Sequence, residues 1–353
     1  MVRLKDIAVR AGVSLMTVSK ALRNAPDISP NTKARIRVLA EQMGYVPDSA
    51  AQNLRNRNSK LFGLVVPSIT NPIFVRMVAA IEARTRDLGC DLILAHSMNL
   101  PDREESSIRR LLSRRVDGLF ISPVYRMAPT APVFEELKRR NTPTVILGHR
   151  APFCQNFANV ECDDLGGSFA ATTHLLELGH KRIAFFSGPL GSPWGQERLD
   201  GYRRALRTAQ IELDDSLIFN AGATVDEGEK AALQLIDESV KVTAVQAVND
   251  LVAIGTANLF LNQGIKIPED LSVIGFGNIL ASEYFRVPLT TLRHPKYRLG
   301  DAAVDCMVQL LNGKTPETRR LPASLVIRES TGPNLPVHVA KIAHPAVEPK
   351  LKS

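Results

Sequence analysis

The chain has 353 residues, is 44% apolar and carries 44 Lys and Arg against 36 Asp and Glu, which gives a net charge of +8. This length is enough for two or three domains with a sizeable core. No apolar run approaches the roughly 18 residues of a membrane span, and the segment MVRLKDIAVR lacks the apolar stretch of a secretory signal. The four cysteines have no CxxC spacing and are expected to be free thiols of a cytoplasmic protein.

The positive charge is concentrated near the N-terminus. Residues 1–60 hold eleven Lys and Arg against four Asp and Glu, a balance of +7, whereas the remaining 33 and 32 give residues 61–353 a balance of +1. A basic module joined to a nearly neutral body suits a polyanionic partner, because neutralised phosphates release condensed counterions. A solvated basic surface without a partner fits the charge equally well, so the residue pattern has to decide.

The first 46 residues show the pattern of three short helices. Residues 4–11 form the first helix, and Gly12 supplies the turn after it because glycine tolerates a positive φ. Ser14 and Ser29 are expected to N-cap the second and third helices, and Gly44 to end the third. Two short helices joined by a glycine turn and braced by a third predict a helix-turn-helix, whose second helix reads the major groove.

Residues 47–60 form the expected hinge. A helix that starts at Pro47 can run only to about residue 57. Isolated helices shorter than about 12–15 residues are marginal in water, so we expect this one to fold on binding DNA. Leu54 lies among polar and basic neighbours. An exposed leucine is common, but beside DNA it can insert between base steps of the minor groove.

Two segments of this region resemble the DNA-binding module of the lactose-repressor-type (LacI/GalR) transcription regulators. They read LKDIAVRAGVSLMTVSKAL and ISPNTKARIRVLAEQMGYVPDSAAQNL, and the resemblance extends to LVIREST at residues 325–331. It implies a pseudo-palindromic double-stranded operator as partner, and a homodimer, since one short helix reads too few base pairs. The residues at DNA-contacting positions are Ser14, Leu15, Met16, Thr17, Ser19, Lys20, Asn24, Asn53 and Leu54.

Two departures from the family pattern affect this interface. Leu15 and Met16 stand where many members have polar side chains, so contacts with thymine methyl groups are expected instead of bidentate hydrogen bonds. Gln52 and Asp48 replace the family's usual arginine and asparagine. The resemblance therefore implies weaker phosphate anchoring at the hinge.

The body from residue 61 onward has the pattern of an α/β protein. Apolar runs without alternation, separated by amphipathic helices, indicate parallel sheets covered on both faces. The runs lie at residues 61–67, 90–95, 116–122, 142–148, 182–188, 216–222, 243–248 and 271–277. They are too many for one ordinary sheet, so two doubly wound subdomains are expected. This agrees with the periplasmic-binding-protein-like core that the resemblance implies.

The predicted domains are a helix-turn-helix domain at 1–46, the hinge at 47–60 and an effector-binding and dimerisation core at 61–332. Within the core we expect crossings between the halves near residues 160, 290 and 322. The N-subdomain then takes about 61–160 and 291–322, and the C-subdomain about 161–290 and 323–332. The Pro-rich tail at 333–353 lacks a heptad pattern and is expected to be disordered.

A ligand of such a core binds at the carboxyl ends of the strands, in the mouth between the halves. The candidates that follow strands are Trp194, Arg198, Asn249, Asp250 and Gly277, and the resemblance adds the effector positions Phe74, Ser122, Asp163, Ser192 and His294. In the alternative interpretation, Trp194 is only packed, Arg198 is an ion-pair residue on a helix, and Asp163 and Asp250 cap helices. Gly277 replaces an aspartate that in the family often takes sugar hydroxyls, so a simple hexose is less favoured as effector, and Asn278 is a possible substitute.

Enzyme motifs are missing from the sequence. It contains no GxSxG, no GxxxxGK[ST] and no GxGxxG, and its seven histidines lack metal-ligand spacing. We therefore expect no catalysis, cofactor or metal. The interpretation is a cytoplasmic, homodimeric transcription regulator, most simply a repressor, whose operator binding is controlled by a small molecule, a sugar or related metabolite. The alternatives are a non-sugar effector or co-repressor, or a solute-binding protein, which would need an export signal and no basic module.

Overall fold

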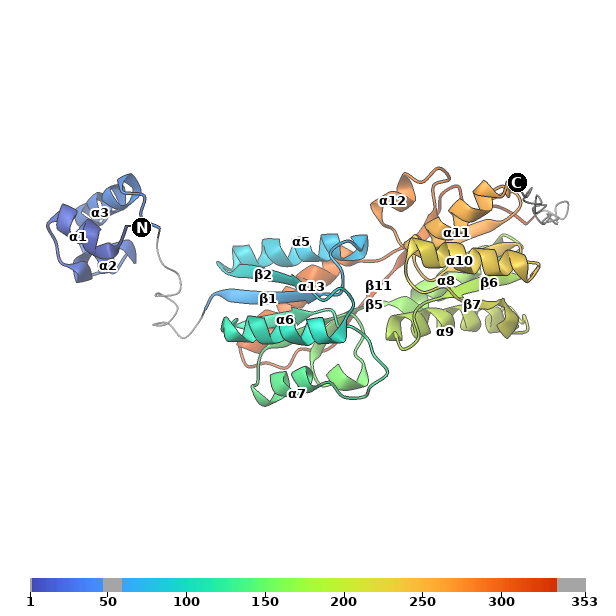
Figure 1. The fold of residues 1–353 in the computed structure, drawn as a ribbon, viewed down its shortest axis with the longest axis horizontal. Coiled ribbons are helices and arrows are strands. Elements are labelled where there is room, and N and C mark those ends of the chain that lie inside the picture. Colours follow the sequence, from blue (N-terminus) through green and yellow to red (C-terminus); the bar gives the residue numbers. More distant parts are fainter. Residues whose placement is uncertain (1, 47–58, 335–353) are drawn as a thin grey trace, which may run out of the picture. The chain divides into compact units, whose positions relative to one another are not determined.

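The computed structural model describes residues 2–46 and 59–334 (Figure 1). By its internal contacts the chain divides into two compact units, residues 1–59 and 60–353. The predicted hinge helix, with Asn53 and Leu54, and nearly all of the tail predicted to be disordered lie outside the described residues. These expectations remain predictions.

The N-terminal unit is a bundle of three short helices, α1 (Leu4–Ala11), α2 (Leu15–Leu22) and α3 (Pro30–Gln42). The turn between α1 and α2 needs Gly12, whose φ is 64°. Ser14 and Ser29 accept hydrogen bonds from main-chain N–H groups of the first turns of α2 and α3, as the sequence predicts. A small core holds the bundle together; its buried members are Ile7, Ala8, Ala11, Val18, Ala21, Ile36 and Ala40.

The core unit contains two six-stranded sheets. The first has the order β11-β5-β4-β3-β1-β2. Its strands are β1 (Leu61–Val66), β2 (Asp91–His96), β3 (Gly118–Ile121), β4 (Thr144–Leu147), β5 (Ala158–Asp163) and β11 (Arg319–Pro322). Its helices are α5 (Pro72–Asp87), α6 (Pro101–Ser113), α7 (Pro132–Arg139) and α13 (Lys296–Leu311), with a 3₁₀ turn at Pro152–Cys154.

The second sheet has the order β12-β10-β9-β8-β6-β7. Its strands are β6 (Ile183–Ser187), β7 (Ile218–Asn220), β8 (Ala244–Ala247), β9 (Ser272–Gly277), β10 (Thr290–Arg293) and β12 (Ser324–Val326). Its helices are α8 (Asp164–Glu177), α9 (Pro193–Thr208), α10 (Val225–Asp237), α11 (Asp250–Asn262) and α12 (Leu280–Glu283), with a 3₁₀ turn at Asp215–Leu217. Only β12 pairs antiparallel, with β10; the other strand pairs are parallel.

Each predicted apolar run overlaps a strand, and the predicted fold class is confirmed. The strands that the runs did not predict are β5, β10, β11 and β12, which flank the crossings between the sheets. In chain order, β5 and β11 lie in the first sheet, while β10 and β12 lie in the second. β11 reads RRLP and alternates in burial, so it has too little apolar character for a run-based prediction.

Helices cover both faces of each sheet (Figure 1), and one apolar cluster joins the two halves. In the first half, α5 and α13 pack on one face, and α6 and α7 on the other. In the second half, α8 and α9 pack on one face, and α10 and α11 on the other. The cluster under α5, α13, α8 and α9 is continuous, so the inner faces of both halves share a core. Within the described residues, no helix is long and apolar enough to cross a membrane.

Candidate functional site

The exposed face of α2 carries several of the predicted DNA-contacting residues. Leu15 and Met16 are 53% and 54% exposed, although both are large and apolar. Ser14 is also exposed, but its hydroxyl is engaged, because it accepts from the Thr17 N–H at 3.0 Å and bonds the Thr17 hydroxyl at 2.8 Å. The face therefore presents two apolar side chains beside a local pair of hydroxyls. Such a surface can contact thymine methyl groups in the major groove.

Lys20, on the same helix, is not a free cation. Its Nζ lies 2.5 Å from Asp27 Oδ2, and both side chains remain partly exposed. The hydrogen bond from Lys20 lowers the pKa of Asp27. Asn24, after the helix, is exposed and has a φ of 60°, a conformation that asparagine tolerates better than most residues. An approaching phosphate has to compete with Asp27 for the lysine.

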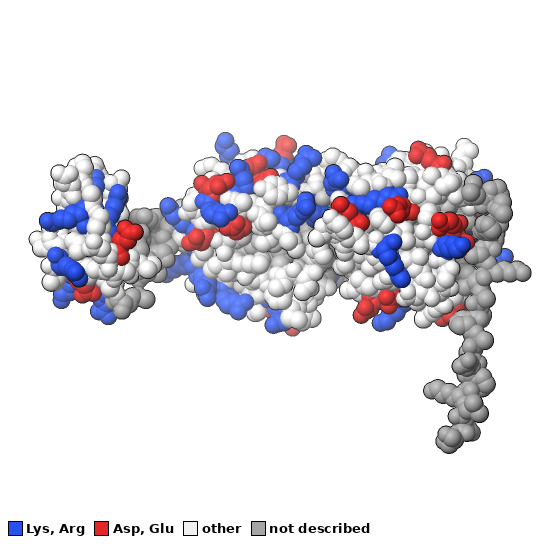
Figure 2. All heavy atoms as spheres, turned by 90° about the horizontal axis from the view of Figure 1, so that it is seen from above, with Lys and Arg blue, Asp and Glu red and all other residues white. Residues whose placement is uncertain are grey.

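The charge balance of residues 61–353 is only +1, against +7 for residues 1–60. On the face shown in Figure 2, acidic and basic side chains are interspersed over residues 59–334, in agreement with the near-neutral charge of this part of the sequence. Whatever this unit binds, its surface charge as a whole does not point to a polyanion.

In the core, the predicted effector residues follow the carboxyl ends of strands from both sheets. Phe74 and Ser122 follow β1 and β3, and Asp163 ends β5. From the second sheet, Ser192, Trp194 and Arg198 follow β6, Asn249 and Asp250 follow β8, Gly277 ends β9, and His294 follows β10. Parallel strands end at the same edge of a sheet, so this topology brings the loops of each half to one side.

Arg198 is the centre of the arrangement and is only 7% exposed. Its Nε and Nη2 donate to Asp164 Oδ1 at 2.8 and 2.6 Å, and its Nη1 donates to the main-chain oxygen of Val248 at 2.6 Å. The guanidinium carbon lies 3.7 Å from the centre of the Phe276 ring and 4.9 Å from the Trp194 ring. The arginine is therefore held by a carboxylate and two aromatic rings, which fixes its orientation.

His149, in the loop after β4, completes this cluster from the first half. Its Nε2 lies 2.7 Å from Asp164 Oδ2, and its Nδ1 lies 3.3 Å from Glu161 and 3.6 Å from Glu197. Burial alone would lower the pKa of His149, but the surrounding carboxylates raise it to about 9. The imidazolium and the guanidinium of Arg198 keep the pKa of the buried Asp164 below its usual range, against the effect of burial. His149, Asp164 and Arg198 thus form one buried ionic cluster.

Two further cationic side chains form bonds between the halves. Arg320 on β11 donates to Glu197 on α9 at 2.5 Å, and also to Asp163 at 3.0 Å. Lys296, at the start of α13, donates to the main-chain oxygens of Gly277 and Asn278 at 2.5 and 2.9 Å. Burial lowers the pKa of Lys296 to about 8. With the His149–Asp164 contact, these bonds tie the first sheet and its helices to the second.

The other predicted residues have different roles in this structure. Asp163 caps α8 and pairs with Arg320, and Asn249 caps α11 and donates to the main-chain oxygen of Ala223. Asp250 is buried, and its carboxylate accepts hydrogen bonds from Thr291 Oγ1 at 2.5 Å and from the Ile279 N–H at 2.8 Å. The capping interpretation thus fits Asp163, while at α11 the cap is Asn249, not Asp250.

The remaining candidate residues differ in their packing and in their hydrogen bonds. Ser192 is buried, bonds the Pro189 oxygen and lines a cavity of about 260 Å³ under the loop after β6. Phe74 packs on the shared core, and Ser122 is buried. Gly277 has a φ of 144°, which suits glycine. The Nδ1 of His294 is buried without a hydrogen-bond partner in the described structure, and burial lowers the pKa of this histidine to about 3.

The side chain of Asn278, the possible substitute for the missing aspartate, is already engaged in a hydrogen bond. Its side-chain oxygen accepts from Arg328 Nη2 at 2.8 Å, and its backbone φ is 49°. The residues that the sequence reasoning missed are His149, Asp164, Glu197 and Lys296. The strand-end rule that selected Arg198 applies to His149 as well, since it comes two residues after β4. No group of His, Cys, Asp and Glu suited to a metal occurs among the described residues.

Comparisons with known proteins agree with this geometry. Residues 3–48 match the model "Bacterial regulatory proteins, lacI family", and residues 172–331 match "Periplasmic binding protein-like domain". A three-helix DNA-binding module followed by a two-sheet core of this type defines a class, the helix-turn-helix transcription regulators with a periplasmic-binding-protein-like domain. Within this class, the chain belongs to the LacI family.

The relatives cover nearly the whole chain. The transcriptional repressor CytR of Escherichia coli K12 is 32% identical, over 93% of this chain and 96% of the relative. The repressor PurR of Vibrio atlanticus is also 32% identical, over 90% and 95%. Among solved structures, the lac repressor dimer bound to operator and the anti-inducer ONPF aligns over 94% of this chain and 99% of its own, with 27% identity and a TM-score of 0.83. The relatives are transcription regulators and not enzymes, and this protein is a DNA-binding transcription regulator.

Proposed function

We propose that the protein is a repressor that binds a pseudo-palindromic operator as a homodimer and responds to a small polar effector in the mouth between its two sheets. It acts in the cytoplasm, where its DNA partner lies. α2 enters the major groove, and two-fold pairing doubles the short sequence that one recognition helix reads. The support is the exposed face of α2 together with the cluster around Arg198.

The observation that carries the regulatory part of this proposal is the His149–Asp164–Arg198 cluster. It joins the loop after β4 in the first half to α8 and α9 in the second. A ligand that bonds the remaining N–H groups of Arg198 acts on a side chain paired with Asp164, whose other oxygen contacts His149 of the first half. Any ligand that prefers one arrangement of the halves shifts the population toward it. Coupling to DNA requires only that operator binding also depends on this arrangement.

The chemistry of the cluster favours a neutral, hydroxyl-bearing or carbonyl-bearing ligand over a second strong anion at Arg198. The charge of this arginine is already balanced by Asp164, and its faces are covered by Trp194 and Phe276. A guanidinium has five N–H donors. In Arg198, one donor on each of Nε, Nη1 and Nη2 is engaged with Asp164 or Val248. The others suit a polar acceptor. Cellobiose is the ligand named in the complex of one structural relative, the regulator CelR.

The proposal is tested by a thermal-shift screen of metabolites followed by operator titration with each hit. The operator itself comes from selection of bound duplexes out of a random DNA library. We expect at least one neutral metabolite to raise the unfolding temperature and to change operator affinity by about 5–150-fold, the range of typical couplings. By linkage, operator DNA must change the affinity for that metabolite by the same factor. A metabolite that binds without any change in operator affinity would contradict the regulatory role of the cleft.

A further inference from the structure

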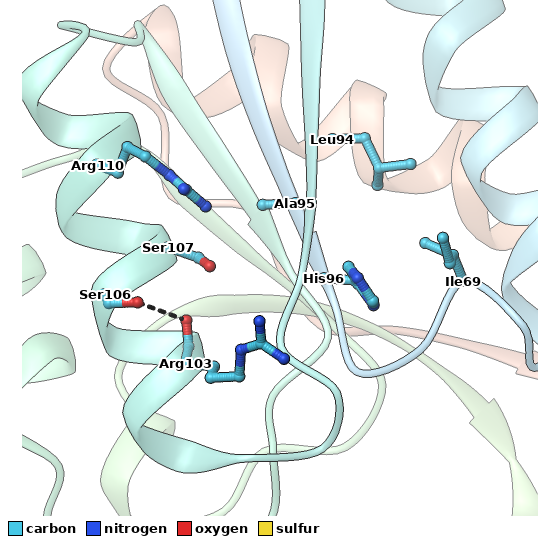
Figure 3. Close-up of a pocket in the computed structure, with 8 residues that line it drawn as sticks. All are labelled: Ile69, Leu94, Ala95, His96, Arg103, Ser106, Ser107 and Arg110. Atoms are coloured by element: carbon cyan, nitrogen blue, oxygen red, sulfur yellow. Dashed lines mark hydrogen bonds between the residues drawn. The ribbon is translucent and has the colours of Figure 1, made fainter.

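A buried carboxylate on α6 lies apart from the ionic cluster around Arg198. Glu104, in the first turn of α6, is 0% exposed, and Ile108 and Leu111 share the buried face of the helix with it. The side of α6 next to β2 is shown in Figure 3, and Glu104 is not among the residues labelled there. Burying a carboxylate costs free energy unless it is paired and hydrogen-bonded. The partners of Glu104 therefore show what this residue holds in place.

Glu104 holds the loop that follows β3, residues 122–131, here called the β3 loop. Its Oε1 accepts a hydrogen bond from the Val124 N–H at 2.6 Å, and its Oε2 accepts from Nη2 of Arg126. The Nε of Arg126 in turn donates to the main-chain oxygen of Val124 at 3.2 Å, and its guanidinium carbon lies 5.0 Å from the centre of the Phe153 ring. Both main-chain polar groups of Val124 are thus engaged, directly or through Arg126, by one carboxylate of α6.

The β3 loop also supports the ionic cluster. Tyr125, the neighbour of Val124, donates its hydroxyl to the main-chain oxygen of His149 at 2.7 Å. His149 contacts Asp164 of the second half. The loop therefore connects the buried carboxylate of α6 to the residue through which the two halves meet.

The same loop touches the second half directly. Met127 is 81% exposed, and Leu190, in the loop after β6, is 86% exposed. Gly191 has a φ of 81°, and a side-chain carbon on its Cα would lie 2.9 Å from Met127 Sδ. Leu190 and Gly191 also line the cavity of about 260 Å³. A contact between such exposed side chains buries little apolar area, so it can break at small cost.

We propose that the β3 loop is a gate at the mouth of the cleft, and that Glu104 is the residue that positions it. In the closed position Val124 and Arg126 are bonded to Glu104, Tyr125 supports the loop after β4, and Met127 lies against Gly191. Release of the anchor frees residues 124–127 together, which opens the mouth and removes a support of the ionic cluster. The purpose of the gate, admission of an effector, rests on the proposed function, but its motion can be measured without an effector.

The titration of Glu104 makes the gate depend on pH. In the described structure this carboxyl is faced by Arg126 and Tyr125 of the β3 loop, by Glu105 of α6 and by the Cys154 thiol of the 3₁₀ turn. Burial raises the pKa of Glu104 from 4.5 to about 7, against the effect of Arg126. When the gate opens and water reaches the carboxyl, its pKa returns toward the ordinary value. The closed gate thus binds the proton more tightly, and closure is favoured as pH falls through about 7.

Hydrogen exchange of the full chain without added ligand, expressed as protection factors, tests the gate. Glu104→Leu removes both acceptors, and we expect the amide protection of residues 124–127 to fall at least tenfold at pH 6, while β8 keeps its protection. Glu104→Gln retains an oxygen for the Val124 N–H and should keep most of the protection. In the original protein the protection of this segment should decrease between pH 6 and pH 8.5. In Glu104→Gln it should not change with pH.

Two further variants serve as controls. Glu135→Gln removes one negative charge from an exposed position on α7, and it should preserve both the protection of the β3 loop and its change with pH. Tyr125→Phe removes only the hydroxyl that bonds His149. It should speed exchange at residues 148–151 and leave the Val124 amide protected, because the anchor at Glu104 is intact.

The proposal is overturned if Glu104→Leu leaves the protection of the β3 loop unchanged. It is also overturned if this variant lowers protection in β8 as much as in the loop, because Glu104 then supports the fold as a whole. A change with pH that persists in Glu104→Gln would overturn it as well, since another group then titrates. Failure of the metabolite screen would instead contradict the proposed function, and the exchange results would not depend on it.

Discussion

At the scale of single residues, the ion pair between Lys20 and Asp27 limits how strongly α2 attracts DNA. The pair is exposed, and its partners lie 2.5 Å apart. Removing the acid should free the lysine and remove a negative charge near the phosphates. We therefore predict that Asp27→Asn tightens binding to duplex DNA by a few-fold, and that the gain shrinks with added salt because exposed charges are screened.

The measurement for Asp27 is fluorescence anisotropy with labelled duplexes of unrelated sequence at several salt concentrations. Glu41→Gln is the control, because it removes the same charge from an exposed position on α3. An equal gain in both variants would show that net charge, not the lysine, is responsible.

Arg198 is the second residue with a specific expectation. Arg198→Gln leaves the carboxylate of Asp164 buried beside a single cation, His149. Breaking a buried pair on one side typically costs about 3–5 kcal/mol. We predict a loss of stability of this order, measured by urea unfolding, and partial recovery in the double variant Asp164→Asn/Arg198→Gln. Recovery would fail if the arginine acts mainly through its aromatic neighbours.

The same substitution tests the regulatory proposal. Arg198→Gln should leave operator binding without effector intact and abolish the response to an effector found by screening. Arg207→Gln, at an exposed position of the last turn of α9, should keep the full response. An undiminished response in the Arg198 variant would place the effector elsewhere.

At the scale of elements, α2 depends on caps for its shape and on two apolar side chains for its specificity. Ser14 fixes the first turn, so Leu15 and Met16 project from a defined helix end. We predict that replacing both by glutamine or asparagine shifts base preference away from thymine at the contacted positions. A lost specific contact is typically worth about 1–3 kcal/mol. Selection from a random library, compared with that of the original protein, measures the shift; an unchanged preference would mean that another element reads these bases.

At the scale of the whole molecule, the contacts between the halves make stability depend on pH. His149 faces the carboxylates of Asp164, Glu161 and Glu197, and its main-chain oxygen accepts from the Tyr125 hydroxyl. The pKa of His149 is raised from 6.5 to about 9 in the folded protein. The folded state thus holds a proton that the unfolded state releases. The contribution of this proton to stability is complete below pH 6.5 and is lost as pH rises through about 9.

The prediction concerns the difference in unfolding free energy between the original protein and His149→Gln. This difference should be largest below pH 6.5 and should decrease as pH rises to 9.5, measured by urea unfolding of the full chain. The subtraction is necessary because the contribution of Lys296 to stability changes with pH in the opposite direction. Its pKa is lowered from 10.5 to about 8, so its effect on stability becomes more favourable as pH rises through this interval. A difference that does not change with pH would mean that His149 is not charged in the folded protein.

The sequence alone was sufficient for most of the elements and for the class of fold. The boundaries of α1, the caps Ser14 and Ser29 and the eight apolar runs depend on local periodicity and local hydrogen bonds, which are determined by near neighbours in the chain. The strands next to the crossings were harder to predict from the sequence. β11, for example, pairs at the edge of its sheet with residues far away in sequence, so its side chains need no apolar run.

The candidate site shows where local reasoning ends. Composition and strand-end position were enough to select Arg198 and Trp194, because both follow β6 in the chain. They did not reveal that Asp164 is bonded to Arg198, that His149 contacts Asp164 from the other half, or that Asn249 caps a helix. Each of these facts depends on which distant side chains share a buried space, and only the packing of the two sheets decides which charges meet there.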